Sequence, residues 1–230
     1  MPLKAVVFDL DGTIATFNLD YKSMRAEVRG YLLQMGVPAS VLSVNESIFE
    51  MLKKTELFMK NQGKTASAME EIRCKALGIA ETYEMEAAKS TSLLPGAEDT
   101  LKTLKRMGLE LGLCTINSEK SMRYILNRFN IAGLFEAAVP RDMVDYVKPS
   151  PAHLEATLKA LGVSAAETVV VGDSISDMQG AKELKAIAIG VPTGVSTKEQ
   201  LTVSGANYIM TSITDLPLLV KRINKAQTAA

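Results

Sequence analysis

The sequence predicts an α/β protein in which a doubly wound, Rossmann-like parallel sheet forms the core and an α-helical domain is inserted after the first strand. Short apolar segments alternate with amphipathic segments along most of the chain, which is typical of strand–helix–strand crossovers in a parallel sheet. The segments "TVVV" (168–171) and "AIAI" (186–189) have the nearly continuous apolar pattern of strands buried on both faces. Residues 19–90 interrupt this alternation with helical periodicity and no convincing strand.

The first strand is predicted at 5–8, and the insertion that follows it is predicted to be wholly helical. Apolar residues recur at helical spacing within the insertion, and glycine or proline residues separate one helix from the next. The expected helices cover 21–36, 39–63, 64–78 and 81–90. We therefore expect two domains: an α/β core made of residues 1–16 and 92–230, and a helical domain made of residues 17–91.

From Leu93 onward the predicted elements alternate, and residues that commonly start or stop helices bound them. Gly108 ends one helix, Ser118 or Ser121 caps the next, and Pro151 opens a third. The expected strands are 109–116, 135–140, 167–173, 186–191 and 206–211, and the expected helices are 97–108, 118–130, 150–162, 177–185 and 213–227.

Composition limits the classes of function. With 230 residues, of which 47% are hydrophobic and 23% charged, the chain can form a sizeable core. Its 26 basic and 26 acidic residues cancel, so nothing favours binding to nucleic acid or to an anionic membrane surface. No apolar run is long enough to predict a transmembrane helix. We expect a cytoplasmic protein, and the sequence leaves open whether it is a monomer or a homodimer.

Three residues could suggest other chemistry: Cys74, Cys114 and His153. The two cysteines lie far apart and form neither a disulfide framework nor a metal-binding spacing, so we expect reduced, buried thiols. His153 is the only histidine and lies just inside a predicted helix, so we expect a structural or surface role for it.

Polar side chains follow four of the predicted strands at the point where each strand ends. Ligands of open parallel sheets bind at the carboxyl ends of the strands, where the strand order reverses. An isolated acid, hydroxyl or lysine could belong to any surface loop, but consecutive strands that deliver such groups to one edge indicate a site. The residues concerned are Asp9, Asp11, Gly12 and Thr13 after the first strand, Thr115 and Asn117 after the second, Lys148 after the third, and Asp173 and Asp177 after the fourth.

These residue types favour the binding of a phosphate group with a hard cation. Asp9, Asp11 and Asp173 would repel one another, and carboxylate oxygens of this kind select Mg²⁺, which also binds substrate phosphates. The Thr115 hydroxyl, the Lys148 ammonium and free backbone N–H groups of residues 10–13 could then bind the phosphate. A carboxylate that faces a phosphoryl group can act as a nucleophile, and a second carboxylate nearby can serve as general acid and base.

The same residues resemble the four motifs of the haloacid dehalogenase-like hydrolases, in the order found in that family. The matching segments are "DLDGT" (9–13), the strand "LGLCT" that ends in Thr115, "KPSP" (148–151) and "VGDSISD" (171–177). The helical insertion resembles the cap domain of the branch that contains phosphoglycolate phosphatase and β-phosphoglucomutase.

The resemblance implies a role for each matching residue. Asp9 would be the nucleophile, Asp11 the general acid and base, and Thr115 and Lys148 would act on the transferring phosphoryl group. The resemblance also implies ligands for Mg²⁺, with Asp11 contributing its backbone carbonyl. The implied metal ligands are Asp9, Asp11, Asp173 and Asp177, and the implied substrate-binding residues are Gly12, Thr13, Thr115, Asn117 and Lys148.

The function predicted in this way is a Mg²⁺-dependent phosphatase that hydrolyses a small phosphorylated metabolite, such as phosphoglycolate or a sugar phosphate, through an aspartyl-phosphate on Asp9. A phosphomutase of the β-phosphoglucomutase type is an alternative, although the insertion lacks the Gly-x-Ser-Arg pattern of those enzymes. A non-catalytic protein that binds a phosphate ligand is a further alternative. Dehalogenation is disfavoured because Asp11 is present. The chain departs from many relatives at Ala15-Thr16-Phe17 and at Ile116, which separates Thr115 from Asn117.

Overall fold

The computed structural model describes the backbone of residues 2–229 and the side chains of residues 2–226. The chain divides into two compact units. One contains Met1–Asn18 and Ser90–Ala230 and holds the α/β sheet, and the other, Leu19–Lys89, is helical.

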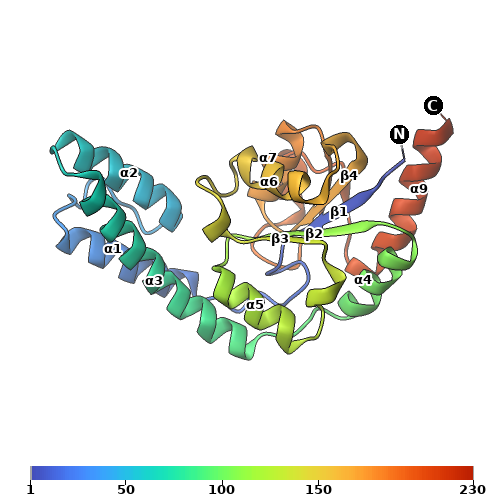
Figure 1. Ribbon diagram of the computed structural model, residues 1–230, viewed down its shortest axis with the longest axis horizontal. Coiled ribbons are helices and arrows are strands. Elements are labelled where there is room, and N and C mark those ends of the chain that lie inside the picture. The colour runs from blue at the N-terminus through green and yellow to red at the C-terminus, as the bar shows by residue number, and fades with distance from the viewer. Residues whose placement is uncertain (1, 230) are drawn as a thin grey trace. The chain divides into compact units, whose positions relative to one another are not determined.

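The described part of the α/β unit contains one parallel sheet of six strands in the order β3-β2-β1-β4-β5-β6, so the predicted fold class is confirmed (Figure 1). The strands buried at the centre are made almost entirely of apolar residues, as the sequence indicated. The strands are β1 (Ala5–Phe8), β2 (Glu110–Cys114), β3 (Ala137–Val139), β4 (Thr168–Gly172), β5 (Ile187–Gly190) and β6 (Tyr208–Ile209).

The strand order reverses between β1 and β4. After β1 the chain adds β2 and β3 on one side, and it then returns to add β4, β5 and β6 on the other. Phe8 lies opposite Val171, and the N–H of Asp9 donates to the carbonyl of Val171 at 2.9 Å. The residues that follow β1 and β4 therefore lie side by side at the carboxyl edge, where a doubly wound sheet binds its ligands.

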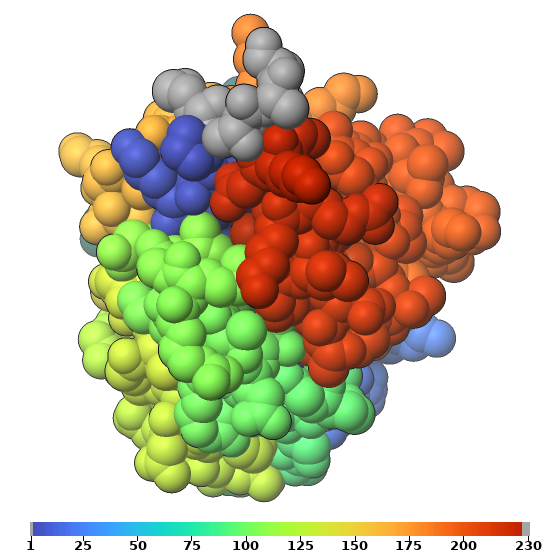
Figure 2. All heavy atoms as spheres, turned by 90° about the vertical axis from the view of Figure 1, so that its right-hand side faces the viewer, coloured from blue at the N-terminus to red at the C-terminus, as the bar shows by residue number. Residues whose placement is uncertain are grey.

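Helices cover both faces of this sheet. On one face, α6 (Pro151–Leu161), α7 (Ile175–Glu183) and α8 (Lys198–Val203) pack on the strands. Val7, Val170 and Ala188, from three adjacent strands, share one apolar cluster with residues of these helices. Figure 1 shows α4 (Ala97–Arg106) and α5 (Glu119–Arg128) on the other face, and α9 (Leu216–Ala229) runs beside α4 on the surface seen in Figure 2.

The helical unit differs from its prediction in two places. Its described helices are α1 (Tyr21–Gln34), α2 (Ile48–Asn61) and α3 (Ala66–Ser90). The predicted helices 64–78 and 81–90 are one continuous helix, because an exposed glycine inside a helix costs only about 1 kcal/mol and does not by itself end it. The helix predicted from 39 begins at Ile48, where the Ser47 side chain accepts a hydrogen bond from the N–H of Glu50. That N-cap signal was present in the sequence and was missed.

The two segments that lead into and out of the helical unit are hydrogen-bonded to each other. The N–H of Thr16 donates to the carbonyl of Ser92 at 2.8 Å, and the hydroxyl of Thr91 donates to the carbonyl of Thr16 at 2.9 Å. The segment Ala15-Thr16-Phe17, where the sequence departs from many relatives, therefore forms a hydrogen-bonded pair of connections within the α/β unit.

The thiol prediction holds for one cysteine and is wrong for the other. Cys114 is buried, and burial raises the pKa of its thiol to about 12. Cys74 is exposed on α3, where its thiol donates to Glu70 at 3.3 Å, because its position on the helix faces solvent and not the apolar cluster. No helix among the described residues is both long enough and apolar enough to span a membrane.

Gly78 tests the continuity of α3. It lies in the helix, and no atom lies within 4 Å of the place that a Cβ would take, so Gly78→Ala should raise the free energy of unfolding by about 1 kcal/mol. Gly63 has a φ of +70°, so Gly63→Ala should be destabilising and serves as the contrast. Urea denaturation measures both, and a loss of stability in Gly78→Ala would mean that the helix breaks there.

Candidate active site

The turn after β1 is closed by its own backbone. The N–H of Gly12 donates to the carbonyl of Ala15 at 2.7 Å, and the N–H of Thr13 donates to the carbonyl of Leu10 at 3.4 Å. The prediction of free N–H groups over residues 10–13 is wrong for Gly12 and Thr13, because these hydrogen bonds within the tight turn use their N–H groups. These hydrogen bonds fix the backbone of the turn that carries Asp9 and Asp11.

Lys148 connects the ends of three strands. Its ammonium group donates to Asp9 Oδ1 at 2.7 Å, to Asp177 Oδ1 at 2.6 Å and to the carbonyl of Cys114 at 2.9 Å. These bonds use all three hydrogens of the ammonium. Burial would lower the pKa of Lys148, but the charges of Asp177 and Asp9 outweigh it and raise the pKa well above its ordinary value. The lysine is therefore a fixed positive charge at the centre of the site.

His153 supports the backbone of Lys148. The N–H of Lys148 donates to His153 Nδ1 at 3.4 Å, and His153 Nε2 lies 3.0 Å from the carbonyl of Val139. Because Nδ1 accepts, Nε2 carries the proton and donates to Val139. Burial, with the nearby Lys148 charge, lowers the pKa of His153 to about 4. The expected structural role fits this placement, in which a neutral, fully buried imidazole ties the lysine segment to the end of β3.

Asp177 is held from both sides. Ser174 and Asp177 form the capping box of α7, in which the Ser174 hydroxyl donates to Asp177 Oδ2 at 2.5 Å and its N–H donates to the same oxygen at 3.2 Å. The other oxygen, Oδ1, accepts from Lys148. Asp177 therefore has a structural role as a helix cap as well as a place in the charged cluster.

Asp173 lies in a narrow space that two glycines create. Its Oδ2 accepts a hydrogen bond from the N–H of Val195 at 2.7 Å. A Cβ on Gly12 would lie 2.7 Å from that carboxyl group, and a Cβ on Gly194 would collide with it. The Thr193 hydroxyl donates to the carbonyl of Gly12 and joins the two loops. Residues 193–195 were not predicted to belong to the site. Their position after β5, at the same edge of the sheet, was the signal in the sequence that could have indicated them.

Asp9, Asp173 and Asp177 form a buried acidic cluster. One carboxylate oxygen from each lies within 4.8 Å of the others. Burial and the neighbouring charges of Asp9 and Asp177 raise the pKa of Asp173 to about 8, and burial is also the main cause that raises the pKa of Asp9. Lys148 is the ammonium that faces them, so three carboxylates share one positive charge. Oxygen ligands with this excess of negative charge fit a hard divalent cation such as Mg²⁺.

Asp11, Thr115 and Asn117 form a second group. The side-chain amide of Asn117 donates to Asp11 Oδ2 at 2.5 Å, and the N–H of Asn117 donates to the Thr115 hydroxyl at 3.2 Å. Thr115 and Asn117 are both buried. Thr13, in contrast, has a fully buried hydroxyl that has no hydrogen-bond partner among the described residues.

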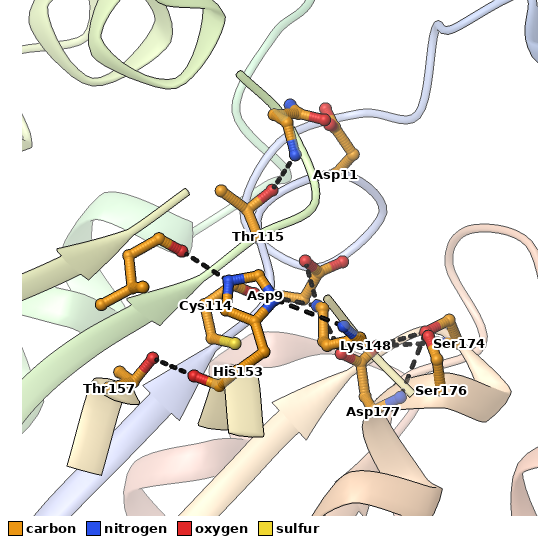
Figure 3. A network of polar contacts seen from close by, with 12 residues as sticks. Asp9, Asp11, Cys114, Thr115, Lys148, His153, Thr157, Ser174, Ser176 and Asp177 are labelled. Atoms are coloured by element: carbon orange, nitrogen blue, oxygen red, sulfur yellow. Dashed lines mark hydrogen bonds and ion pairs between the residues drawn. The ribbon is translucent and has the colours of Figure 1, made fainter. Parts of the chain in front are cut away.

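The predicted site residues are thus brought to one edge of the sheet in two connected groups. Figure 3 shows Asp9, Lys148 and Asp177 in one network of polar contacts, and it shows Thr115 and Asp11 above them in this view. Asp9 and Asp11 belong to the same turn but have different partners, an ammonium group for Asp9 and a neutral amide for Asp11. Gly12 takes part through its closeness to Asp173.

Fold and site together define a doubly wound α/β enzyme. Its cluster of carboxylates and one lysine lies at the carboxyl edge of the sheet, at the point between β1 and β4 where the strand order reverses (the switch point). Residues 3–185 match the family model described as haloacid dehalogenase-like hydrolase, and the chain belongs to this family.

Similar proteins support the same assignment. A phosphoglycolate phosphatase of Pseudomonas fluorescens is 32% identical over 184 residues, which cover 78% of this chain and 65% of that relative, just under two thirds of its length. A phosphoglycolate phosphatase of Shigella boydii is 28% identical over 93% of this chain and 91% of its own. The crystal structure of a hydrolase from Pseudomonas syringae superposes with a TM-score of 0.68, with 26% identity over 96% of this chain and 99% of that one. The chain is accordingly a phosphatase of this family, as predicted.

The buried imidazole predicts a pH dependence of stability. His153 has a pKa of about 4 in the folded protein and an ordinary value of 6.5. Between these two pH values, His153 is therefore protonated in the unfolded chain and neutral in the folded protein. Its contribution is complete above pH 6.5 and is lost as the pH falls toward 4, by up to about 1.4 kcal/mol per pH unit. Urea denaturation of the wild type and of His153→Gln should show a smaller loss in the variant over this interval. Equal losses would contradict the buried neutral histidine.

Proposed function

We propose that the protein is a Mg²⁺-dependent phosphatase that hydrolyses a small phosphorylated metabolite of the phosphoglycolate type through an aspartyl-phosphate on Asp9. The observation that carries this proposal is the position of Asp9. It lies at the switch point of the sheet, with Oδ1 bound to Lys148 and with Asp173 and Asp177 close by. A nucleophile beside a fixed ammonium and a cation site is the arrangement that phosphoryl transfer requires.

The residues that would hold the metal are Asp9, Asp173 and the backbone carbonyl of Asp11, with Asp177 near them. The cation would neutralise charge on the phosphoryl oxygens of the substrate. Asp173 is suited to this role because the N–H of Val195 and the two flanking glycines fix its carboxylate in one place. Asp177 already caps α7 and binds Lys148, which favours a supporting role for it.

The chain's own residues account for the chemical steps. Lys148 binds Oδ1 of Asp9, so Oδ2 is the oxygen that would attack phosphorus. As the bond from phosphorus to the leaving oxygen breaks, the carboxyl group of Asp11 gives its proton to that oxygen. The resulting Asp11 carboxylate then takes a proton from water, whose oxygen attacks phosphorus. This breaks the bond to Asp9, which returns as a carboxylate, and releases inorganic phosphate.

Phosphate binding requires an exchange of partners at Lys148. Its three hydrogens are bound to Asp9, Asp177 and Cys114, so it must weaken one of these bonds to donate to a phosphoryl oxygen. Thr115 can contribute its hydroxyl, which is a hydrogen-bond donor while it accepts from Asn117. The names of the relatives favour phosphoglycolate as the substrate. We assign substrate selection to residues 17–91 as a cap domain.

Replacing the nucleophile tests the mechanism. Asp9→Asn keeps an oxygen that can accept from Lys148, so the fold should be retained while phosphate release from phosphoglycolate falls by more than about 10³-fold. The wild type should prefer phosphoglycolate to sugar phosphates in kcat/KM. The exposed variant Asp215→Asn is the matched control and should keep full activity. Retained turnover in Asp9→Asn would rule out this residue as the nucleophile.

Thermal unfolding with and without Mg²⁺ tests the metal site independently of turnover. Saturation at 100 times the dissociation constant stabilises a protein by about 2.7 kcal/mol, which corresponds to a Tm increase of roughly 5–10 °C for a chain of this length. Asp173→Asn removes one of three clustered carboxylates, so its metal-free Tm should equal or exceed that of the wild type and its Mg²⁺ shift should be lost. Asp215→Asn should keep the shift. A full shift in Asp173→Asn would exclude Asp173 as a ligand.

A further inference from the structure

Asn117 is placed to control the side chain of Asp11. Its amide NH₂ group donates to Asp11 Oδ2 at 2.5 Å, so Oδ2 is the oxygen of Asp11 that accepts in this contact. Asn117 itself is 5% exposed, so its amide leaves water to make this contact. In a buried setting a polar side chain is retained where its hydrogen bonds are satisfied, and Asp11 satisfies this one.

Hydrogen bonds from Arg141 hold the loop that carries Asn117 in place. Arg141, which follows β3, donates through its backbone N–H to the carbonyl of Asn117 at 3.2 Å and through its guanidinium to the carbonyl of Ile116 at 3.1 Å. Arg141 is almost fully buried, an uncommon place for arginine. From the other side, the N–H of Asn117 is bound to the Thr115 hydroxyl. The backbone of Asn117 is therefore fixed at both its N–H and its carbonyl.

An amide carried on a fixed backbone limits the orientations of the carboxyl group it binds. The second side-chain torsion of an aspartate is broad, so an isolated carboxyl group samples many orientations. A proton donor must come within about 2.6–3.2 Å of the leaving oxygen to be effective. The Asn117 amide occupies Oδ2 of Asp11 and can do so whether Asp11 is charged or protonated. It therefore directs the proton to the other oxygen, Oδ1.

We propose that Asn117 is a positioning residue that orients Asp11 for proton transfer to the leaving group, and that it does not itself bind the substrate phosphate. This inference rests on the proposed function, in which Asp11 is the general acid. Asn117 would then act in the proton transfer to the leaving oxygen, a step on which poor leaving groups depend more strongly than good ones. Alkyl and phenyl phosphates need a proton on the departing oxygen, whereas p-nitrophenyl phosphate releases a stabilised phenolate without one.

The test compares leaving groups. General acid catalysis supplies roughly 10²–10⁴-fold, so loss of orientation in Asn117→Ala should lower kcat/KM for phenyl phosphate about tenfold more than for p-nitrophenyl phosphate. Asn117→Leu has a side chain of similar size without the donor and should show the same selective loss, which keeps the test open if the alanine variant folds poorly. Asp11→Asn should show the selective loss in a stronger form. In the Asp11→Asn background, Asn117→Ala should cause no further selective loss.

Ser118→Ala is the matched control for damage to the loop. Ser118 adjoins Asn117 and caps α5 by accepting from the N–H of Ser121 at 3.3 Å, so its loss should reduce stability without changing the ratio between the substrates. Equal losses for both substrates in Asn117→Ala, or a further selective loss on top of Asp11→Asn, would overturn the proposal. Failure of the proposed function is a separate result, since Asp9→Asn would then retain turnover on both substrates.

Discussion

The burial of three carboxylates around one ammonium is the constraint on which the rest of the site depends. Charged groups leave water at a high cost unless they are paired and hydrogen-bonded. The sheet provides the place, because the strand order reverses between β1 and β4 and brings Asp9 beside the segment that carries Asp173 and Asp177. Lys148 offsets part of this cost with two ion pairs, and the remaining negative charge is what makes the cluster suited to a cation.

The supporting contacts follow from that constraint. Asp177 needs the capping box of α7, Asp173 needs the N–H of Val195, and Lys148 needs the buried imidazole of His153 behind its backbone. The supports come from three places in the chain: Ser174 at the N-terminus of α7, Val195 after β5, and His153 in α6. The functional groups are consequently held by rigid elements of the α/β unit, which is the condition for preorganised catalysis.

The acids and the lysine could be identified from the sequence because each lies in the segment that follows a predicted strand. Thr193, Gly194 and Val195 were not predicted. They act through a hydroxyl group, the absence of a Cβ and a backbone N–H, respectively, and these contacts form only where two loops that are distant in the sequence meet. In the helical unit, Gly78 was overestimated as a stop signal and Ser47 was overlooked as a start signal. Both errors are local, whereas the doubly wound parallel sheet was predicted as a fold class from the alternation of elements. The order of its strands, which brings the site residues together, was not predicted and comes from the structure.

In the proposed mechanism the two acids of the β1 turn have two different chemical roles, and their surroundings differ accordingly. Asp9 faces an ammonium, which favours its charged form, although burial opposes this and raises its pKa. Asp11 faces a neutral amide, which can remain bound to it as a proton comes and goes. Carboxylates with different environments are suited to different tasks, and the proposed mechanism assigns attack to Asp9 and proton transfer to Asp11. The partner of each acid comes from a different strand end, Lys148 from beyond β3 and Asn117 from beyond β2, so the division of labour between neighbouring residues depends on the order of the strands.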